Sequence, residues 1–390
     1  MSLVLNHQQY EAANACYEWW KSINRKQVFE IVGPAGSGKT TIVKVLMEKI
    51  GLRREEVLFM AYVGKATQAL AMKGNFAKTV HSSIYDVVDI PRKDDVGNFI
   101  VKSGRFVTRK GFVKKEGLPE GVRLIVLDEG GMIDPRTAAD ILSFGIPVLV
   151  LGDLDQLPPI FGNSFFLRYP DVILTEVMRQ KADSPILWLA DRARKNQELP
   201  IGTYDNCRVI AKEDLTDSDL FNPDMIITGK NATRDNLNSY IRKSILKVED
   251  YVPLIYGDKI VCRQNNWKRN LDDNIYLING MVGYVDAIDL SSYSQHSLSI
   301  DFRPDFEDFR TFNNVQVDLD FLARPAADKE GGFSRYDKFQ FAYAITCHMS
   351  QGSQYHDVLY YQEHYGSKDF MRRLNYTAIT RAEEILTIAV

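Results

Sequence analysis

The residues at 33–40 have the types and the spacing that hold a polyphosphate. They read Gly-Pro-Ala-Gly-Ser-Gly-Lys-Thr and match the pattern G-x-x-x-x-G-K-[ST] at every position. Glycines allow backbone N–H groups to turn toward phosphate oxygens, and the start of a following helix adds a partial positive charge. Because an apolar run at 28–32 precedes the loop and an apolar stripe of helical period follows it, we predict a strand, a phosphate-binding loop and a helix.

The cofactors expected at this loop are ATP and Mg2+. We predict that the ammonium group of Lys39 reaches the β- and γ-phosphates and that the hydroxyl of Thr40 holds the metal ion. A glycine-rich turn that binds nothing is the alternative, and the order of strand, loop and helix disfavours it. The residues expected to contact nucleotide here are Gly33, Pro34, Ala35, Gly36, Ser37, Gly38, Lys39, Thr40 and Thr41.

Two carboxylates, Asp128 and Glu129, follow an apolar strand predicted at 124–127. We expect Asp128 to hold Mg2+ through water and Glu129 to orient and deprotonate an attacking water molecule. A strand that ends in Asp-Glu is by itself also typical of a solvated strand end. Its place downstream of the phosphate loop makes it an indication of nucleotide hydrolysis.

A second apolar strand, at 149–151, runs into the polar loop 152–159, which ends in two prolines. Gln156 in this loop is a candidate for sensing a γ-phosphate and its loss. The alternative is a proline-terminated surface turn, which leaves the polar residues after a buried strand unexplained.

Composition limits the class of protein. The chain has 390 residues, 45% of them hydrophobic, and a net charge of -3, so it can bury more than one core and is not coated with positive charge. It contains no apolar run of about 18 residues, and its start lacks the pattern of a signal peptide, so we expect no membrane contact and a cytoplasmic address. The cysteines lack any C-x-x-C spacing, which argues against a zinc site or a disulfide framework; they are Cys16, Cys207, Cys262 and Cys347.

Short apolar segments alternate with helical stretches in both halves of the chain, which predicts an α/β fold with parallel sheets. Turn-rich, strand-like sequence interrupts the pattern twice, near 84–122 and again from 257 to about 327. The predicted division is a first domain at 1–83 and 123–180 with a β-hairpin insertion at 84–122, a connecting region at 181–223, and a second domain at 224–278 and 328–390 with a small β-barrel insertion at 279–327.

In this order the segments resemble the motifs of superfamily 1B helicases, the branch that includes RecD and the phage helicase Dda. The resemblance covers nearly the whole chain and implies two RecA-like P-loop NTPase domains, with the barrel insertion of SH3-like fold. The matching segments are 5–9 (Q motif), 33–41 (motif I), 128–129 (motif II), 152–159 (motif III), 174–180 (motif IV), 341–353 (motif V) and 375–382 (motif VI).

The resemblance also implies roles for single residues. Gln9 is expected to read the edge of adenine, Arg179 to act as an arginine finger, and Arg381 to place a second positive charge at the γ-phosphate. An ATP site built from both domains suits a motor, because closing and opening the cleft converts hydrolysis into domain motion.

The resemblance also implies which residues contact DNA. These residues are expected to bind the sugar-phosphate backbone, which suits movement along any DNA sequence. They are Lys65, Thr79, His81, Thr346, His348 and Gln351. Phe99 and Phe106, in the basic hairpin insertion, are candidates for a strand-separating pin, although they could instead form the small core of the hairpin. Taken alone, His81 would more often be a core histidine.

The chain departs from the family pattern at two places. Gly130 and Gly131 follow the Asp-Glu pair, where the family usually has Ala and a small polar residue, and Tyr62-Val63 stand where Pro-Thr is common. We therefore expect any difference from the family in the coupling to DNA rather than in ATP hydrolysis.

Together these observations predict an ATP-dependent 5′-to-3′ DNA helicase that translocates on single-stranded DNA and opens duplexes at junctions. We expect a monomer from a phage or an accessory bacterial system in replication, recombination or repair, with a single-strand-binding or replisome protein as a candidate partner. An RNA helicase of the same superfamily and a non-unwinding DNA-dependent ATPase switch are the alternatives. A simple P-loop kinase would leave the second half of the chain unexplained.

Overall fold

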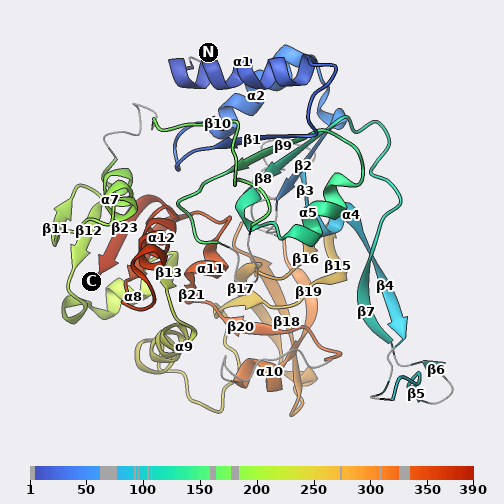
Figure 1. Ribbon diagram of the computed structural model, residues 1–390. Helices are drawn as coiled ribbons and strands as arrows, with labels where there is room; N and C mark the ends of the chain where they lie inside the picture. The colour runs from blue at the N-terminus through green and yellow to red at the C-terminus, as the bar shows by residue number, and fades with distance from the viewer. Residues whose placement is uncertain are drawn as a thin grey trace.

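The computed structural model describes residues 5–61, 77–91, 94, 96–102, 105–106, 108–158, 164–176, 184–272, 275–306, 310–324 and 334–390. It contains two α/β domains, a protruding hairpin and a β-sheet insertion (Figure 1). The predicted α/β class with parallel sheets is confirmed.

The first domain is built on a parallel sheet in the order β10-β1-β9-β8-β2-β3. Strands β2 and β9 are apolar and buried along their whole length because both faces of the sheet are covered. The strands are β1 (Val28–Val32), β2 (Val57–Ala61), β3 (Ala77–Thr79), β8 (Leu124–Asp128), β9 (Val148–Gly152) and β10 (Val172–Ile173).

Helices α1 (His7–Lys21) and α2 (Lys39–Ile50) pack on one face of this sheet, and α4 (Val80–Ile84) and α5 (Pro135–Leu142) pack on the other (Figure 1). The sequence sets the start of α1, because the side chain of Asn6 accepts from the Gln9 N–H while the Gln9 side chain accepts from the Asn6 N–H. Two short 3-10 turns belong to this domain, η1 (Arg54–Glu56) and η2 (Gly130–Met132).

The hairpin protrudes from the first domain directly after α4. Strands β4 (Tyr85–Pro91) and β7 (Thr108–Lys114) pair antiparallel, and β5 (Val101–Lys102) pairs with β6 (Arg105–Phe106) at the tip. These strands lie inside the range 84–122 that the sequence indicated for an insertion. Figure 1 shows the hairpin standing away from both sheets.

The second domain has a sheet in the order β11-β12-β23-β22-β13-β21, parallel except for the β11–β12 pair. Its strands are β11 (Gly202–Tyr204), β12 (Cys207–Ile210), β13 (Met225–Thr228), β21 (Ala344–Thr346), β22 (Tyr355–Tyr361) and β23 (Ala382–Ala389). Its helices are α7 (Pro185–Arg194), α8 (Asp217–Phe221), α9 (Asn231–Tyr240), α11 (Cys347–Ser350) and α12 (Lys368–Ile379), with a 3-10 turn at Lys212–Asp214 and a π-helical turn at Ile241–Ile245.

The region 181–223, predicted to connect the domains, is part of the second domain. Helix α7 contributes Ile186 and Leu189 to the apolar core of that domain, and β12 pairs parallel with β23. The sequence did not indicate this because β12 alternates buried and exposed positions, and the strand that gives it a place in the sheet lies at the other end of the chain.

The β-sheet insertion is larger than the predicted range 279–327. Its antiparallel sheet has the order β19-β18-β17-β14-β20, so it includes strands on both sides of that range. A short apolar run has the same sequence pattern in a parallel strand and in an antiparallel strand. Only the strand with which it pairs decides to which sheet it belongs. The elements are β14 (Lys259–Cys262), β15 (Asn266–Asp272), β16 (Ile275–Leu277), β17 (Val282–Asp289), β18 (Ser297–Pro304), β19 (Phe312–Asp318), β20 (Phe339–Phe341), α10 (Leu319–Ala323) and a 3-10 turn at Leu290–Ser292.

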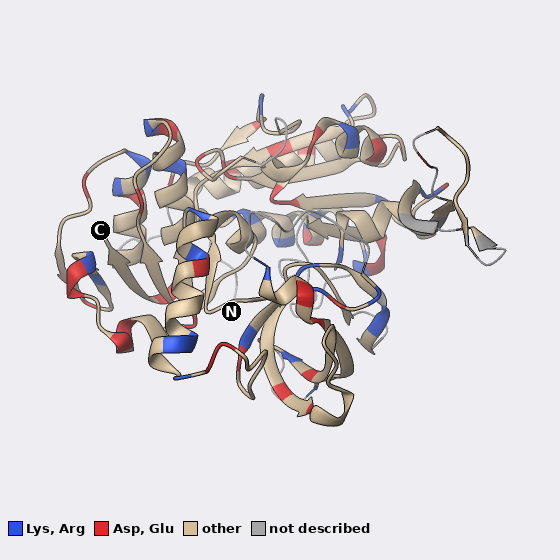
Figure 2. Cartoon of the chain, turned by 90° about the horizontal axis from the view of Figure 1, so that it is seen from below, with Lys and Arg blue, Asp and Glu red and all other residues tan. Residues whose placement is uncertain are grey.

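In the cartoon of Figure 2, positions of Lys and Arg alternate along the described chain with positions of Asp and Glu, as expected for a net charge of -3. Within the ranges given above, the model has no helix with both the length and the apolar character that crossing a membrane requires.

Candidate active site

The phosphate-binding loop joins β1 to α2 and depends on glycine at defined positions. Gly36 and Gly38 have φ values of 79° and 84°, in the left-handed region that side chains disfavour. A Cβ atom on Gly33 would lie 2.8 Å from the Cβ atom of Leu174. The loop is therefore shaped by its glycines, with the first turn of α2 directly after it.

The polar atoms of the loop fit a polyphosphate. The ammonium group of Lys39 donates to the carbonyl oxygens of Gly33, at 2.6 Å, and Pro34, at 3.1 Å, so it is folded over the loop. The hydroxyl oxygen of Ser37 is buried, and no atom of the described residues hydrogen-bonds to it. A buried polar atom of this kind costs free energy unless a ligand or water satisfies it, and an anion held by the loop would do so.

Gln9 is buried and braces the phosphate loop. Its side-chain Nε2 donates to the carbonyl oxygen of Ser37 at 2.9 Å, and its Oε1 accepts from the backbone N–H of Asn6 at 3.1 Å. Both ends of the amide therefore bond to the protein in this structure. Because Nε2 carries a second N–H and Oε1 a second lone pair, these bonds leave the reading of adenine through Gln9 as a prediction.

Gln8, which the sequence analysis did not single out, ties the N-terminal segment to the chain leading to Arg179. Its Oε1 accepts from the backbone N–H groups of Thr175, at 2.9 Å, and Glu176, at 3.0 Å. Arg179 itself lies outside the described residues, so its role as an arginine finger stays a prediction.

Asp128 is the last residue of β8 and Glu129 follows it, within reach of the charge of Lys39 from the phosphate loop. The backbone N–H of Glu129 donates to the Asp128 carboxylate at 2.9 Å, and Glu129 has a left-handed φ of 52°. Burial and the charge of Asp128 raise the pKa of Glu129, while Arg381, Lys39 and a hydrogen bond from Gln156 oppose this rise. The net direction is upward, which brings the carboxylate closer to the pKa range useful for accepting a proton.

The Gly130-Gly131 departure has a physical cause. A Cβ atom on Gly130 would lie 2.2 Å from Cγ1 of Val150 in β9 and 3.3 Å from the carbonyl oxygen of Leu151. On Gly131 it would lie 3.4 Å from Cδ1 of Leu167, an ordinary contact. Glycine at 130 thus lets the turn after Glu129 pack directly on the neighbouring strand.

The loop 153–157, after β9, is held by helix α12 of the second domain. A guanidinium N–H of Arg372 donates to the Asp155 carboxylate at 2.5 Å, and one of Arg373 donates to the Leu154 carbonyl oxygen at 2.6 Å. The backbone N–H of Leu157 donates to the Thr377 hydroxyl at 2.9 Å. Because Gln156 lies within this loop, its position depends on the second domain.

Arg381 follows α12 and is buried, with 4% of its surface exposed. Its guanidinium donates to the carbonyl oxygens of Thr377 and Ser353, at 3.0 and 3.1 Å. Its charge nevertheless acts on Glu129 across the domain boundary. In the structure Asp128, Lys39, Gln156 and Arg381 all act on Glu129 and form one cluster with it, and their catalytic roles stay predictions.

Two further residues belong to this cluster. Tyr376 donates its hydroxyl to the Asp153 carboxylate at 2.6 Å, and the same oxygen accepts from the backbone N–H of Ala35 at 2.9 Å. Both lie in segments that resemble helicase motifs, but the sequence analysis gave neither a role. The available signal was the charge of Asp153 directly after a buried strand.

The expected DNA contacts on the first domain are distributed around the base of the hairpin. Thr79 caps α4 by accepting from the Ser82 N–H at 3.2 Å. His81 packs its ring 5.6 Å from that of Tyr85 and 5.5 Å from that of Phe112, and burial lowers its pKa. His81 is therefore neutral at pH 7 and joins α4 to the hairpin. Lys65 lies outside the described residues.

At the tip of the hairpin, Phe99 and Phe106 pack edge to face with ring centroids 5.5 Å apart. They are still 51% and 58% exposed, so they pair with each other and remain available to a base. This geometry is compatible with both alternatives from the sequence, a strand-separating pin and a small core of the hairpin.

The expected contacts on the second domain lie around α11. Thr346 is its N-cap residue, and His348 stacks on Phe370 with its pKa lowered by burial. Gln351 is 1% exposed and donates its side-chain amide to the Leu157 carbonyl oxygen at 2.8 Å. In this structure Gln351 therefore contacts the first domain rather than a surface that DNA could reach.

Comparison with protein families identifies two segments. Residues 4–212, more than half of the chain, match the family model described as an AAA domain. Residues 341–389 match the model described as a UvrD-like helicase C-terminal domain. These segments contain the phosphate loop and Arg381, respectively.

Among curated proteins, the ATP-dependent RecD2 DNA helicase of Deinococcus radiodurans is 25% identical over 91% of this chain and 46% of its own length. The chain spans less than half the length of the first two curated relatives that it matches, 38% of one and 46% of the other.

Among solved structures, Pif1 helicases on forked double-stranded DNA share the fold, with a TM-score of 0.57 and 17% identity over 100% of this chain and 92% of that chain. Bacteroides Pif1 bound to single-stranded DNA gives a TM-score of 0.54 and 18% identity, over 100% and 93% of the two chains. At such identities the likeness shows the fold alone.

Proposed function

Because this chain belongs to the AAA-domain family, carries a UvrD-like helicase C-terminal domain and is related to RecD- and Pif1-type helicases, we propose that it is an ATP-dependent DNA helicase. The observation that carries the proposal is the cluster around Glu129, to which both domains contribute charge and hydrogen bonds. A nucleotide site shared in this way makes hydrolysis depend on the relative position of the domains.

Each residue of the cluster has a distinct task at the nucleotide. Mg2+-bound ATP supplies the phosphoryl group that is transferred to water. Lys39 and the N–H groups of the phosphate loop would bind the phosphates, and Thr40 and Asp128 would hold Mg2+, which would neutralise charge on the phosphate oxygens. Glu129 accepts the proton of the attacking water, for which its raised pKa suits it.

The second domain supplies Arg381, whose charge stabilises the negative charge that develops in the transition state. Gln156 hydrogen-bonds to Glu129 from a loop that α12 holds, so the base and the second domain are linked through one side chain. Hydrolysis of ATP and release of its products from the phosphate loop then change the contacts of α12.

The substrate we propose is single-stranded DNA entering at a duplex junction, followed in the 5′-to-3′ direction. The likeness to helicases named for DNA supports the choice of DNA, and membership of the RecD and Dda branch supports the direction. Phe99 and Phe106 would separate the strands, and their exposure at the hairpin tip supports this part of the proposal. Thr79, His81, Thr346 and His348 would contact the backbone without reading sequence.

We further propose an SH3-like fold for the β-sheet insertion and action as a monomer in the cytoplasm of a bacterium or an infected host, in replication, recombination or repair. A single-strand-binding or replisome protein is the partner class that fits such work. These finer statements rest on the family relationship.

Steady-state ATP hydrolysis with and without nucleic acid tests the proposal. Single-stranded DNA is expected to raise kcat at least about tenfold, whereas RNA of the same sequence is not; Lys39→Ala should remove the activity. Lys44→Ala is the matched control, because Lys44 is an exposed lysine on the same helix. Stimulation by RNA alone would indicate the RNA helicase, and nucleotide binding without hydrolysis would indicate the switch.

A further inference from the structure

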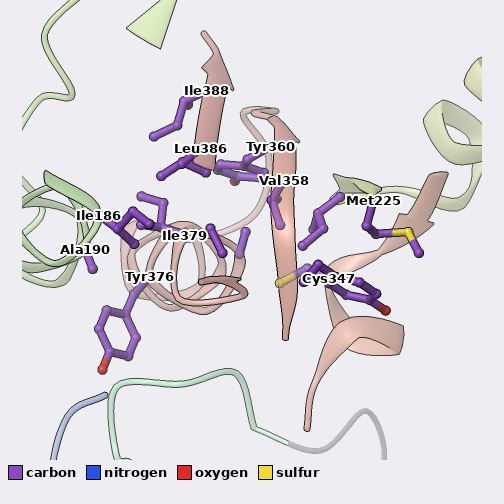
Figure 3. Close-up of a cluster of buried hydrophobic side chains, with 14 of the residues drawn as sticks. Ile186, Ala190, Met225, Cys347, Val358, Tyr360, Tyr376, Ile379, Leu386 and Ile388 are labelled. Carbon is purple, nitrogen blue, oxygen red and sulfur yellow. The ribbon is translucent and has the colours of Figure 1, made fainter. Parts of the chain in front are cut away.

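The hydroxyl of Tyr376 is the meeting point of three segments of the chain. It donates to the carboxylate of Asp153, which follows β9, and it accepts from the N–H of Ala35 in the phosphate loop. Tyr376 belongs to α12 and is 2% exposed. Figure 3 shows it at the border of the apolar cluster of the second domain, with the hydroxyl directed away from the other labelled side chains.

The protonation of this group is fixed. Burial and the negative charge of Asp153 both raise the pKa of Tyr376, so the phenol keeps its proton at any working pH. It can therefore donate to Asp153 permanently, and its lone pairs remain available to Ala35. The phenol of Tyr376 therefore stays the donor of this bridge, while burial raises the pKa of its acceptor, Asp153.

The bridge is rigidly connected to Arg381. The Arg381 Nε donates to the carbonyl oxygen of Thr377, the residue next to Tyr376, at 3.0 Å. The Thr377 hydroxyl accepts from the backbone N–H of Leu157, next to Gln156. These hydrogen bonds connect Ala35, through one helical turn, to Gln156 and Arg381, two of the groups that act on Glu129.

We propose that Tyr376 is a positioning residue that couples the phosphate loop to α12, so that Gln156 and Arg381 are presented to Glu129 together. The inference rests on the proposed function and assigns its interdomain coupling to one hydroxyl group. Alignment of this kind matters in the transition state more than in nucleotide binding, so its loss lowers kcat and leaves KM nearly unchanged.

Tyr376→Phe in the full chain tests the inference, because it deletes the hydroxyl and keeps the packing of the ring. Tyr360→Phe is the matched control. Tyr360 is equally buried, and its hydroxyl donates to Asn375 at 2.7 Å within the second domain. Both variants lose one buried hydroxyl, but only the first loses a contact with the first domain.

The expected result is a roughly tenfold lower DNA-stimulated kcat for Tyr376→Phe, with KM for ATP within about twofold of the wild type. Tyr360→Phe should keep the wild-type kcat even if its melting temperature falls as much as that of Tyr376→Phe. A wild-type kcat in Tyr376→Phe, or an equal loss in both variants, would overturn the inference while the proposed function stands. A wild-type protein without ATP hydrolysis would overturn the proposed function and this inference with it.

Discussion

The side-chain amide of Gln351 donates to the carbonyl oxygen of Leu157 at 2.8 Å, which joins the second domain to the loop after β9 of the first. Both residues are buried, at 1% and 3% exposure. From the resemblance to RecD and Dda helicases, we predicted that Gln351 contacts DNA. In this chain the structure gives it an interdomain contact that lies beside the Gln156 position.

Gln351→Ala should therefore weaken the joint between the domains and leave DNA binding almost intact. We expect a loss of about 1–2 kcal/mol in the free energy of unfolding, because the Leu157 carbonyl oxygen loses a buried partner. Affinity for a labelled single-stranded oligonucleotide, measured by fluorescence anisotropy, should stay within about twofold of the wild type. Gln354→Ala, at an exposed position nearby, is the control, and a large loss of DNA affinity specific to Gln351→Ala would restore the original expectation.

Gly130→Ala should destabilise the first domain. The new methyl group would meet Val150 at 2.2 Å, and overpacking of this kind costs about 1–3 kcal/mol. Gly131→Ala, which meets Leu167 at 3.4 Å, should change the free energy of unfolding by less than about 0.5 kcal/mol. Urea unfolding measures the free energy of unfolding of both variants. Equal values would contradict the close packing of Gly130 against β9.

Glu129→Gln should abolish ATP hydrolysis and change how stability depends on pH. The folded protein raises the pKa of Glu129 above its ordinary value of 4.5, so ionising it costs free energy in the folded state only. The wild type should lose stability relative to Glu129→Gln as pH rises from about 4.5 through the folded pKa, and the two should converge below that interval. Urea unfolding at a series of pH values checks this, and a difference that is constant with pH would contradict the raised pKa.

Gln8→Ala should lower kcat several-fold without impairing nucleotide affinity. Gln8 holds the backbone of Thr175 and Glu176, just before the candidate arginine finger Arg179, and its loss releases that segment. His7→Ala, on an exposed neighbouring side chain, serves as the control. If Gln8→Ala and His7→Ala hydrolyse ATP equally well, the N-terminal segment does not position Arg179.

The parts of the site that could be predicted are those in which residue type alone carries the chemistry. Adjacent residues indicate the function in two segments, the loop from Gly33 to Thr40 and the pair Asp128-Glu129. The resemblance to superfamily 1B helicases, drawn from such segments, is confirmed. Local sequence also predicted the α/β class, because apolar periodicity decides it.

The remainder depended on contacts between distant segments. Nothing near Tyr376 in the sequence indicates that its hydroxyl meets Ala35 and Asp153, and nothing near Cys207–Ile210 indicates that this strand pairs with β23. The β-sheet insertion also includes β20, which lies beyond the strand-like sequence noted from 257 to about 327, because β20 pairs antiparallel with β14. Gly130 was recognised as a departure, but its cause lies across the sheet in Val150.

The measurement that tests the central claim most directly is ATP-dependent unwinding of a duplex with a single-stranded tail at either the 5′ or the 3′ end. We predict that the wild type opens only the 5′-tailed duplex and that Lys39→Ala opens neither, while Lys44→Ala behaves as the wild type. Preference for the 3′ tail would contradict the assigned direction. If neither duplex opens while DNA still stimulates ATP hydrolysis, the protein is not a helicase, and the coupling through Tyr376 serves translocation or switching alone.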